Sequence, residues 1–262
     1  MIAETPLLVE RVDGYLRLTL QRPKQRNALN AALCLAMQEA LSQAASDSGV
    51  RAVLLRADGP FCAGLDVGEL DYEGRPATEI TAPIERHLNP LIETLARMTV
   101  PVVCAVSGAA AGAGFGLTLA CDYVLASEEA IFLCAFSRLG LSPDSGVSFH
   151  LSRSLGERTA LAVAMMDEPI SAQHALSLGL VWRVVSREAL DAEAEALTQT
   201  LARKATKALS LTKRAILGAS MRSLEEQLAY ELRLQMEAVM SHDAREGLAA
   251  IRERRPPVFE GQ

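Results

Sequence analysis

Four short stretches in the first half of the chain are rich in apolar residues: one alternates apolar with polar residues, and three are apolar almost throughout. Residues 15–20 alternate, with leucines on one face and polar side chains on the other, which is typical of a half-buried strand. The stretches 50–55, 102–106 and 123–126 are apolar almost throughout and predict buried strands. A turn-rich segment, 57–60, follows the first of these three.

Helical spacing separates these strands. Asn30 is a suitable N-cap, and Leu33, Met37 and Leu41 follow it on one helical face. Residues 80–98 predict a second helix, which is disturbed at Pro90 and stopped by Pro101. Strands that alternate with helices in this way indicate an α/β core.

The second half of the chain is predominantly helical. We expect short helices at 144–155, 157–166 and 171–178, then a short strand at 180–185. Every periodic stretch after residue 188 is helical. Two apolar stripes mark this part, one formed by Leu190, Ala194, Leu197 and Leu201 and the other by Leu224, Leu228, Leu232 and Met236. Both predict packing against the core, with a neighbouring subunit as the alternative.

Composition narrows the class of protein. The 262 residues carry 26 Lys and Arg against 32 Asp and Glu, a formal charge of −6, which gives no electrostatic reason to expect nucleic acid or an anionic membrane as partner. The sequence contains no apolar run long enough for a transmembrane helix and begins without the pattern of a secretory signal. A cytoplasmic location is the prediction.

Cysteine and histidine usage argues against disulfides and metals. The five cysteines are odd in number and form no CxxC pair, so we expect reduced thiols without structural zinc. The four histidines are widely spaced, which does not favour a metal site.

Two glycine-bearing turns are candidates for chemistry. Residues 63–66 and 112–114 each follow a predicted strand and precede a predicted helix. Two such turns that face one point could present main-chain N–H groups to a developing oxyanion. Taken singly, each turn is explained equally by close packing of a strand on a helix. The second turn is not a dinucleotide fingerprint, because Leu117 occupies the place of its last glycine.

Five segments, in this order and spacing, carry a family resemblance. They are Arg22–Pro23 with Asn27–Asn30, Phe61–Asp66, Pro101–Gly108 with Gly112–Gly114, Cys121–Asp122, and Ile170–Ala175 with Gly179–Val181. With these motifs the chain resembles the enoyl-CoA hydratase/isomerase (crotonase) superfamily over nearly its whole length. Within that superfamily, it is most similar to the 1,2-epoxyphenylacetyl-CoA isomerase and enoyl-CoA isomerase group.

The resemblance implies an α/β fold built as a crotonase-type spiral of β-β-α repeats with a C-terminal α-helical region. It places the acyl-CoA-binding and catalytic core in residues 1–198 and a helical oligomerisation region in 199–262. A homotrimer or hexamer is expected. The implied substrate is an acyl-CoA thioester, and coenzyme A, as part of that substrate, is the only cofactor expected.

The resemblance also assigns site residues. The amides of Leu65 and Ala113 would hold the thioester oxygen. The residues that would line the coenzyme A and acyl site are Ala28, Ala63, Gly64, Asp66, Val67, Gly112 and Phe136. The position of Ala113 is usually glycine in the family, a departure that a backbone donor tolerates.

The choice of reaction depends on a carboxylate. Hydratases of the family use two glutamates, and the matching positions here are Gly116 and Phe136, which argues against hydratase activity. Asp144, after Pro143, matches the catalytic aspartate of the isomerases. Read from the sequence alone, it could equally be an N-cap. One carboxylate can remove a proton from an acyl chain and return it elsewhere, and an apolar environment would raise its pKa.

Alternatives remain open at this stage. A dehalogenase of the superfamily also has an aspartate at this place, but it needs Trp and His where Phe136 and Asn89 stand. An acyl-CoA-binding homologue without turnover and a lyase or hydrolase with the same oxyanion hole are the others. Cys62, His87 and His150 are interpreted as packing or surface residues rather than catalytic ones.

Overall fold

The computed structural model describes residues 5–66, 68 and 73–262. Its main sheet has six strands in the order β1-β2-β3-β4-β6-β9. The strands are β1 (Leu7–Val12), β2 (Tyr15–Leu20), β3 (Ala52–Ala57), β4 (Val102–Val106), β6 (Tyr123–Ser127) and β9 (Arg183–Val185). Strand β1 is antiparallel to β2, and every other neighbouring pair is parallel.

A smaller sheet lies beside the ends of the main strands. It has three strands in the order β5-β7-β8, namely β5 (Ala109–Ala111), β7 (Ile131–Leu133) and β8 (Ile170–Ser171). Each of the pairs β4–β5 and β6–β7 therefore contributes one strand to each sheet. This double use of consecutive strands, followed by helices, is the β-β-α repeat that the sequence led us to expect.

Helices complete the structure. The α-helices are α1 (Ala31–Ser46), α2 (Ala77–Ile80), α3 (Asn89–Arg97), α4 (Ala113–Leu119), α5 (Val147–Met166), α6 (Ala172–Ser177), α7 (Leu190–Ala202), α8 (Thr206–Ala219), α9 (Leu224–Val239) and α10 (His242–Glu253). Short helical turns are η1 (Pro23–Gln25), the π-helical η3 (Ile84–Leu88) and η4 (Ser137–Leu139).

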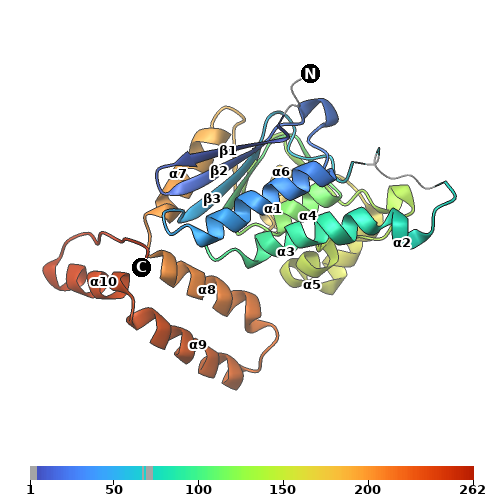
Figure 1. The fold of residues 1–262 in the computed structure, drawn as a ribbon. Helices are drawn as coiled ribbons and strands as arrows, with labels where there is room; N and C mark the ends of the chain where they lie inside the picture. Colours follow the sequence, from blue (N-terminus) through green and yellow to red (C-terminus); the bar gives the residue numbers. More distant parts are fainter. Residues whose placement is uncertain (1–4, 67, 69–72) are drawn as a thin grey trace.

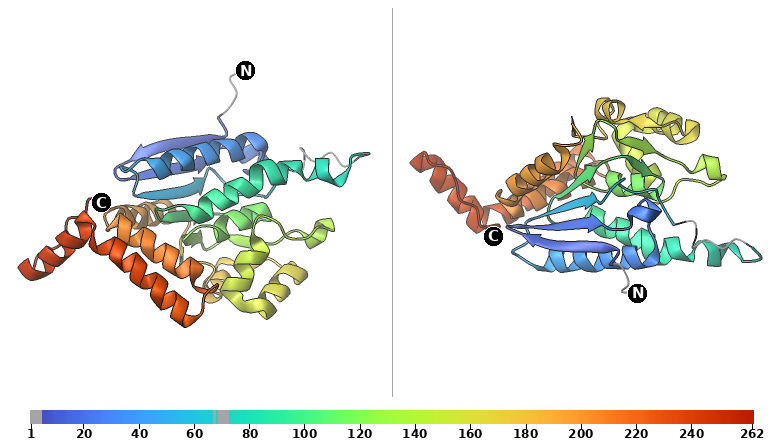
Figure 2. Two further views of the ribbon diagram at one scale, coloured as in Figure 1. Left: turned by 60° about the horizontal axis from the view of Figure 1, so that its bottom comes forward. Right: turned by 90° about the horizontal axis from the view of Figure 1, so that it is seen from above.

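Helices cover both faces of the main sheet (Figure 1 and Figure 2). On one face, α1 buries Leu33, Met37 and Leu41 in a cluster that includes Leu18 and Leu55. On the other face, α7 packs its own apolar stripe against inward-facing residues of β2, β3 and β4. Because side chains alternate along a strand, the buried strands supply both clusters, which explains their near-continuous apolar sequences.

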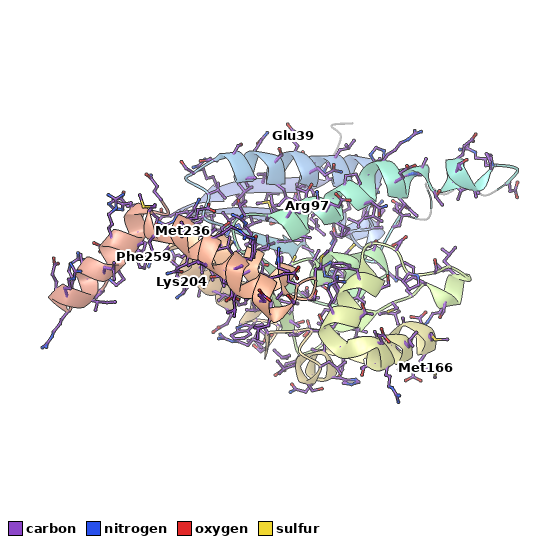
Figure 3. The ribbon with its side chains drawn as sticks, turned by 90° about the horizontal axis from the view of Figure 1, so that it is seen from below. Glu39, Arg97, Met166, Lys204, Met236 and Phe259 are labelled. Carbon is purple, nitrogen blue, oxygen red and sulfur yellow. The ribbon has the colours of Figure 1, made fainter. Side chains whose placement is uncertain are left out.

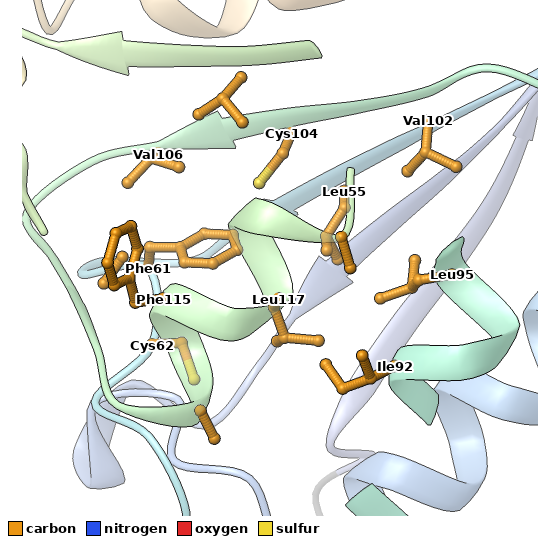
Figure 4. Packing of buried hydrophobic residues seen from close by; sticks show 14 of the residues in the cluster. Leu55, Phe61, Cys62, Ile92, Leu95, Val102, Cys104, Val106, Phe115 and Leu117 are labelled. Carbon is orange, nitrogen blue, oxygen red and sulfur yellow. The ribbon is translucent and has the colours of Figure 1, made fainter. Parts of the chain in front are cut away.

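Helix α4 lies at the centre of the larger cluster. Figure 4 shows its residues Phe115 and Leu117 between β4 and the side chains of α3, with Cys62 beside its first turn. Phe115 and Leu117 are both fully buried. The first turn of α4 is therefore held in a rigid apolar environment, which fixes the direction of its N-terminal amides.

Several predicted boundaries change in the structure. The helix expected at 80–98 is divided into the π-helical turn η3 and helix α3, because Pro90 suits the first turn of a new helix. The helices expected at 144–155 and 157–166 form α5, which is interrupted at Gly156, where φ is 73°. Helix α4 begins at Ala113, inside the glycine turn 112–114 instead of after it.

The three C-terminal helices extend away from the sheet (Figure 1). The predicted boundary between residues 198 and 199 falls inside α7, whose last turn, with Leu201 and Ala202, is buried against the sheet. Helices α8–α10 are joined to the core by polar contacts. Lys213 donates to Asp122 at 2.9 Å, and Arg51 donates to the carbonyl oxygen of Phe259 at 2.9 Å.

The two apolar stripes differ in burial. The first, on α7, packs in the core as predicted, but the second lies on the surface of α9, so its predicted core packing is wrong. Leu224, Leu228, Leu232 and Met236 are 75%, 57%, 63% and 63% exposed. Figure 3 shows these helices from below, with Met236 on α9. The oligomerisation role of this region remains a prediction.

Gly114 provides a stability test of the packing of α4. A Cβ at this position would lie 2.4 Å from the Cys62 carbonyl oxygen, so we expect Gly114→Ala to destabilise the protein by about 2–4 kcal/mol. Gly247, in α10, is the control, because a Cβ there would meet only the Phe259 ring at 3.6 Å. Gly247→Ala should be stabilising by about 0.5–1 kcal/mol. Urea unfolding measures both, and equal effects would contradict this account of Gly114.

Candidate active site

The first glycine turn is anchored on two sides. Cys62 pairs in parallel with Ala110 of β5, and Leu65 pairs in parallel with Leu29. The Leu29 amide donates to the Gly64 carbonyl oxygen at 2.7 Å, and the Asp66 amide donates to the Leu29 carbonyl oxygen at 2.8 Å. In a parallel pair, alternate peptide groups of a strand bond to the same neighbour, and here Gly64 and Asp66 bond to Leu29. The Leu65 amide between them therefore points away from Leu29.

The two glycine turns meet at Gly64. Its φ is 105°, and a Cβ there would lie 2.9 Å from the Ala111 carbonyl oxygen and 3.6 Å from the Ala113 amide nitrogen. Only glycine combines this backbone angle with so close an approach. The turn that carries the Leu65 amide therefore lies against the first residue of α4, and neither the Leu65 amide nor the Ala113 amide has a hydrogen-bond acceptor among the described residues.

The second turn is held from the other direction. Gly112 has φ 53° and ψ −120°, and its amide donates to the Leu133 carbonyl oxygen at 2.9 Å. Ala113 is the first residue of α4 and is buried. Its amide belongs to the group of N-terminal helical donors that have no intrahelical acceptor. The arrangement can stabilise negative charge on an oxygen placed between the turns.

The predicted coenzyme A segments form a polar cluster beside these turns. Asp66 does not present a free carboxylate, because Arg22 donates to it at 2.9 Å and also bonds the Ala28 carbonyl oxygen. Ala28 is buried, whereas Ala63 is exposed. Val67, also predicted for this site, lies outside the described residues.

Arg22 and Asn27 are structural anchors whose role the sequence pattern did not reveal. Asn27 is fully buried with φ 54°, and its side chain donates to the carbonyl oxygens of Asp58 and Pro60. The Asn27 amide oxygen accepts from the Arg22 amide at 2.7 Å. Together they fix the segment that carries Ala28 and Leu29. Their place in the family motifs was the only signal in the sequence.

Asp144 is half-buried, and its carboxylate does not cap a helix. Helix α5 begins at Val147 with Gly146 as N-cap and has no side-chain capping bond, so the N-cap interpretation is wrong. The Val147 amide bonds the main-chain oxygen of Asp144 instead. Burial raises the pKa of Asp144, and a 2.6 Å hydrogen bond from the Ser145 hydroxyl lowers it in part. The net rise is that of a carboxylate suited to accept a proton.

Gly116 brings Asp144 against the glycine turn. A Cβ at Gly116 would lie 2.5 Å from the Ser145 Cβ and 2.7 Å from the Ser145 carbonyl oxygen. Ser145 is itself buried with φ 52°, a left-handed conformation. The space that a side chain at position 116 would need is therefore occupied by the segment carrying Asp144.

Apolar side chains adjoin this segment. Phe136 is 6% exposed and lies in the main core cluster, so only its margin can face a ligand. Phe115 is fully buried and contacts Phe132, with ring centroids 5.8 Å apart. Phe115 supports the site from behind instead of lining it.

A cavity of about 520 Å³ lies beside the Asp144 segment and not between the two turns. Its walls are mostly apolar, formed by Leu141, Pro143 and both halves of α5 around Leu151 and Leu161. Asp144, Leu65 and Ala113 are not among its described walls. The close approach of the two glycine turns, rather than cavity size, therefore locates the candidate site.

Other reactive groups are less suitable for catalysis. Burial raises the pKa of the Cys62 thiol to about 12, so this thiol is not a nucleophile. Burial lowers the pKa of His150, whose ring lies against the position of Gly146. His87, on the π-helical turn, has a buried Nδ1 without a hydrogen-bond partner.

The described residues contain no cluster of His, Cys, Asp or Glu arranged to bind a metal ion. The helices described are also too short or too polar to cross a membrane.

Comparisons with known proteins define the family. A model described as enoyl-CoA hydratase/isomerase matches residues 10–262. The chain is 39% identical over 251 residues to a 1,2-epoxyphenylacetyl-CoA isomerase of Escherichia coli K12, covering 95% of this chain and 96% of that protein. It is 38% identical over 251 residues to a probable enoyl-CoA hydratase of Rhodobacter capsulatus, with the same coverage.

Structural comparison agrees. An enoyl-CoA hydratase from Polaromonas sp. JS666 superposes with a TM-score of 0.91 at 38% identity, covering 97% of this chain and 99% of that one. The chain therefore belongs to the enoyl-CoA hydratase/isomerase family, whose members act on acyl-CoA thioesters, and it has the crotonase fold. Isomerase and hydratase relatives are almost equally similar, so similarity defines the family and leaves the reaction to the site.

The interpretation of Cys62 as a packing residue can be tested by alkylation. With its pKa raised to about 12 and its side chain buried, Cys62 should stay unlabelled by iodoacetamide at about pH 8, whereas half-buried Cys121 reacts. Peptide mass spectrometry would locate the label. Labelling in urea provides the control, since all five thiols should then react. Native labelling of Cys62 as fast as Cys121 would contradict the interpretation.

Proposed function

We propose that this protein is an acyl-CoA isomerase that moves a double bond, or opens a strained ring, through an enolate. The amides of Leu65 and Ala113 hold the thioester oxygen, and Asp144 moves the proton. The observation that supports it most is the close approach of Gly64 to Ala113 at the start of α4, together with the contact of Gly116, in the same helix, with Ser145 next to Asp144.

The chemistry follows from charge. Removing a proton next to a thioester carbonyl places negative charge on its oxygen, and each well-placed donor lowers that barrier by about 3–4 kcal/mol. Asp144, with its pKa raised by burial, takes the proton and returns it at another carbon. The step consumes no other reactant. No metal or organic cofactor beyond the coenzyme A of the substrate is proposed.

Isomerisation is favoured over hydration by the contact at Gly116. Family hydratases need a glutamate at this position, but Ser145 occupies the space that its Cβ would take. Phe136 replaces the second glutamate with an apolar, nearly buried ring. One carboxylate remains at the site, which is sufficient to shuttle a proton and insufficient for the usual two-carboxylate addition of water.

The remaining assignments complete the proposal. Coenzyme A would bind along the segments that contain Ala28, Ala63, Gly64 and Asp66, which Arg22 holds together. The exposed apolar face of α9 would be covered in a homotrimer or hexamer, because large exposed leucines in a regular stripe are typical of an interface. The proposed location is the cytoplasm.

A substrate screen tests the class of reaction. The protein would be incubated with 3-enoyl-CoA, dienoyl-CoA and epoxyphenylacetyl-CoA, and the products analysed by absorbance and mass spectrometry. Products isomeric with the substrate support the proposal. Gain of the mass of water would indicate a hydratase, and release of free coenzyme A would indicate a hydrolase. Coenzyme A binding with no product would favour a binding protein.

Asp144→Asn should lower isomerisation, and proton exchange into the acyl chain in heavy water, at least about 100-fold. The amide cannot accept the proton, but the oxyanion donors remain, so binding of the acyl-CoA should change little. Asp58→Asn, at an exposed turn, is the matched control. Full activity in a folded Asp144→Asn variant would exclude Asp144 as the base.

Ser145→Ala tests the pKa assignment. The Ser145 hydroxyl lowers the pKa of Asp144, so removing it should raise this pKa further while keeping the Cβ that packs on Gly116. The base acts as a carboxylate, and activity is lost as the pH falls through its pKa. The acid limb of the kcat profile should therefore move to higher pH in Ser145→Ala.

Ser148→Ala serves as the control for that shift, because Ser148 is an exposed serine three residues away. Its profile should match that of the parent. An acid limb that stays in place in Ser145→Ala, or that moves to lower pH, would mean that the Ser145 hydroxyl does not bond the catalytic carboxylate.

A further inference from the structure

One short segment connects the oxyanion turn with Asp144. Strand β7 ends at Leu133, whose carbonyl oxygen accepts from Gly112 at 2.9 Å. The chain then passes through Ala135 and Phe136 into η4. The Phe136 carbonyl oxygen accepts from the amide of Leu141, three residues before Asp144. The position of segment 134–138 thus affects both the amide side and the carboxylate side of the site.

A single buried carboxylate, Asp167, holds this segment. It follows α5 and is 2% exposed. One carboxylate oxygen accepts from the Ala135 amide at 2.6 Å, and the other accepts from the Ser137 hydroxyl at 3.1 Å. Arg138 donates to the Asp167 main-chain oxygen at 2.5 Å, and its Nε lies 3.5 Å from the carboxylate.

These contacts make the carboxylate and the segment dependent on each other. A buried carboxylate is unfavourable unless donors surround it, and within the described chain the donors to the Asp167 carboxylate come from residues 135–138. In return, Asp167 keeps Ala135 at φ 63°, a conformation that an alanine does not prefer. The backbone bend at Ala135 directs Phe136 into the core.

We propose that Asp167 is a positioning residue for the reaction. Its carboxylate fixes residues 135–138, so that Phe136 stays in the core and its carbonyl oxygen keeps its bond to Leu141 in the segment that leads to Asp144. This role rests on the proposed isomerase function. The bonds of Asp167 go to residues 135–138 and not to the segments of Ala28, Ala63, Gly64 and Asp66 that we propose for coenzyme A, so it should affect the chemical step more than coenzyme A binding.

The kinetic test compares two buried aspartates. Asp243 is also 2% exposed, and it accepts from the amides of Glu260 and Gly261 at 2.8 Å each, far from the site in α10. Asp167→Ala should lower kcat about 10- to 100-fold, because small misplacements of reacting groups are costly, and leave KM within about threefold. Asp243→Ala should change neither constant. Equal kinetics in the two variants would overturn the proposal.

Asp167→Asn keeps the experiment decisive if the alanine variant does not fold. The amide retains an acceptor for Ala135 but loses the charge that faces Arg138 and places a donor near Ser137. It should give a smaller fall in kcat with KM again unchanged. A rise in KM at unchanged kcat would overturn the positioning role.

Trypsin cleavage after Arg138 gives a readout independent of activity. Releasing the segment should make this bond in the full-length Asp167→Ala chain cleave faster than in Asp243→Ala, as followed by mass spectrometry. If the parent protein turns over no acyl-CoA, the proposed isomerase function fails. Equal cleavage rates in the two variants would then also overturn the proposal that Asp167 fixes residues 135–138. Faster cleavage with unchanged kcat in an active enzyme would overturn positioning.

Discussion

The close approach of two chain segments, 62–65 and 110–114, determines the rest of the site. Cys62 accepts from the Ala111 amide, and its own amide donates to Ala109, so the first turn is bonded directly to the strand that leads into the second. Glycine at positions 64 and 114 removes the side chains that would separate them. Two amides without acceptors in the described chain can meet only because of this contact.

The absence of a side chain at Gly116 also determines which carboxylate lies near α4. Gly116 has no Cβ, and the buried Ser145 takes its place, which brings the neighbouring Asp144 to α4. Burial then raises the pKa of this carboxylate, while the Ser145 hydroxyl limits the rise. The proposed reaction therefore follows from a missing side chain as much as from the acid that is present.

Stability and site geometry are supplied by different parts of the chain. The sheet and α4 form a closely packed apolar core, whereas buried polar anchors such as Asn27 and Asp167 hold the loops that carry the site. The C-terminal helices have a third role, because α9 leaves its apolar stripe exposed in the described chain. The proposed assembly surface is thus separate from the core, whereas the site lies at the margin of the core, to which Ala113 and Phe136 both belong.

The sequence by itself identified the central strands at residues 15–20 and 102–106, although the first is buried on both faces and not half-buried as its alternation predicted, and its motifs identified the family. Tertiary structure alone decided that Asp144 caps no helix, that Asp66 pairs with Arg22, and that Asp167 bonds segment 135–138. It also decided that the α9 stripe faces outward. The periodicity of apolar residues indicates which face of a helix or strand is apolar. Contacts between residues distant along the chain depend on how the helices and strands pack together, which a local sequence pattern does not encode.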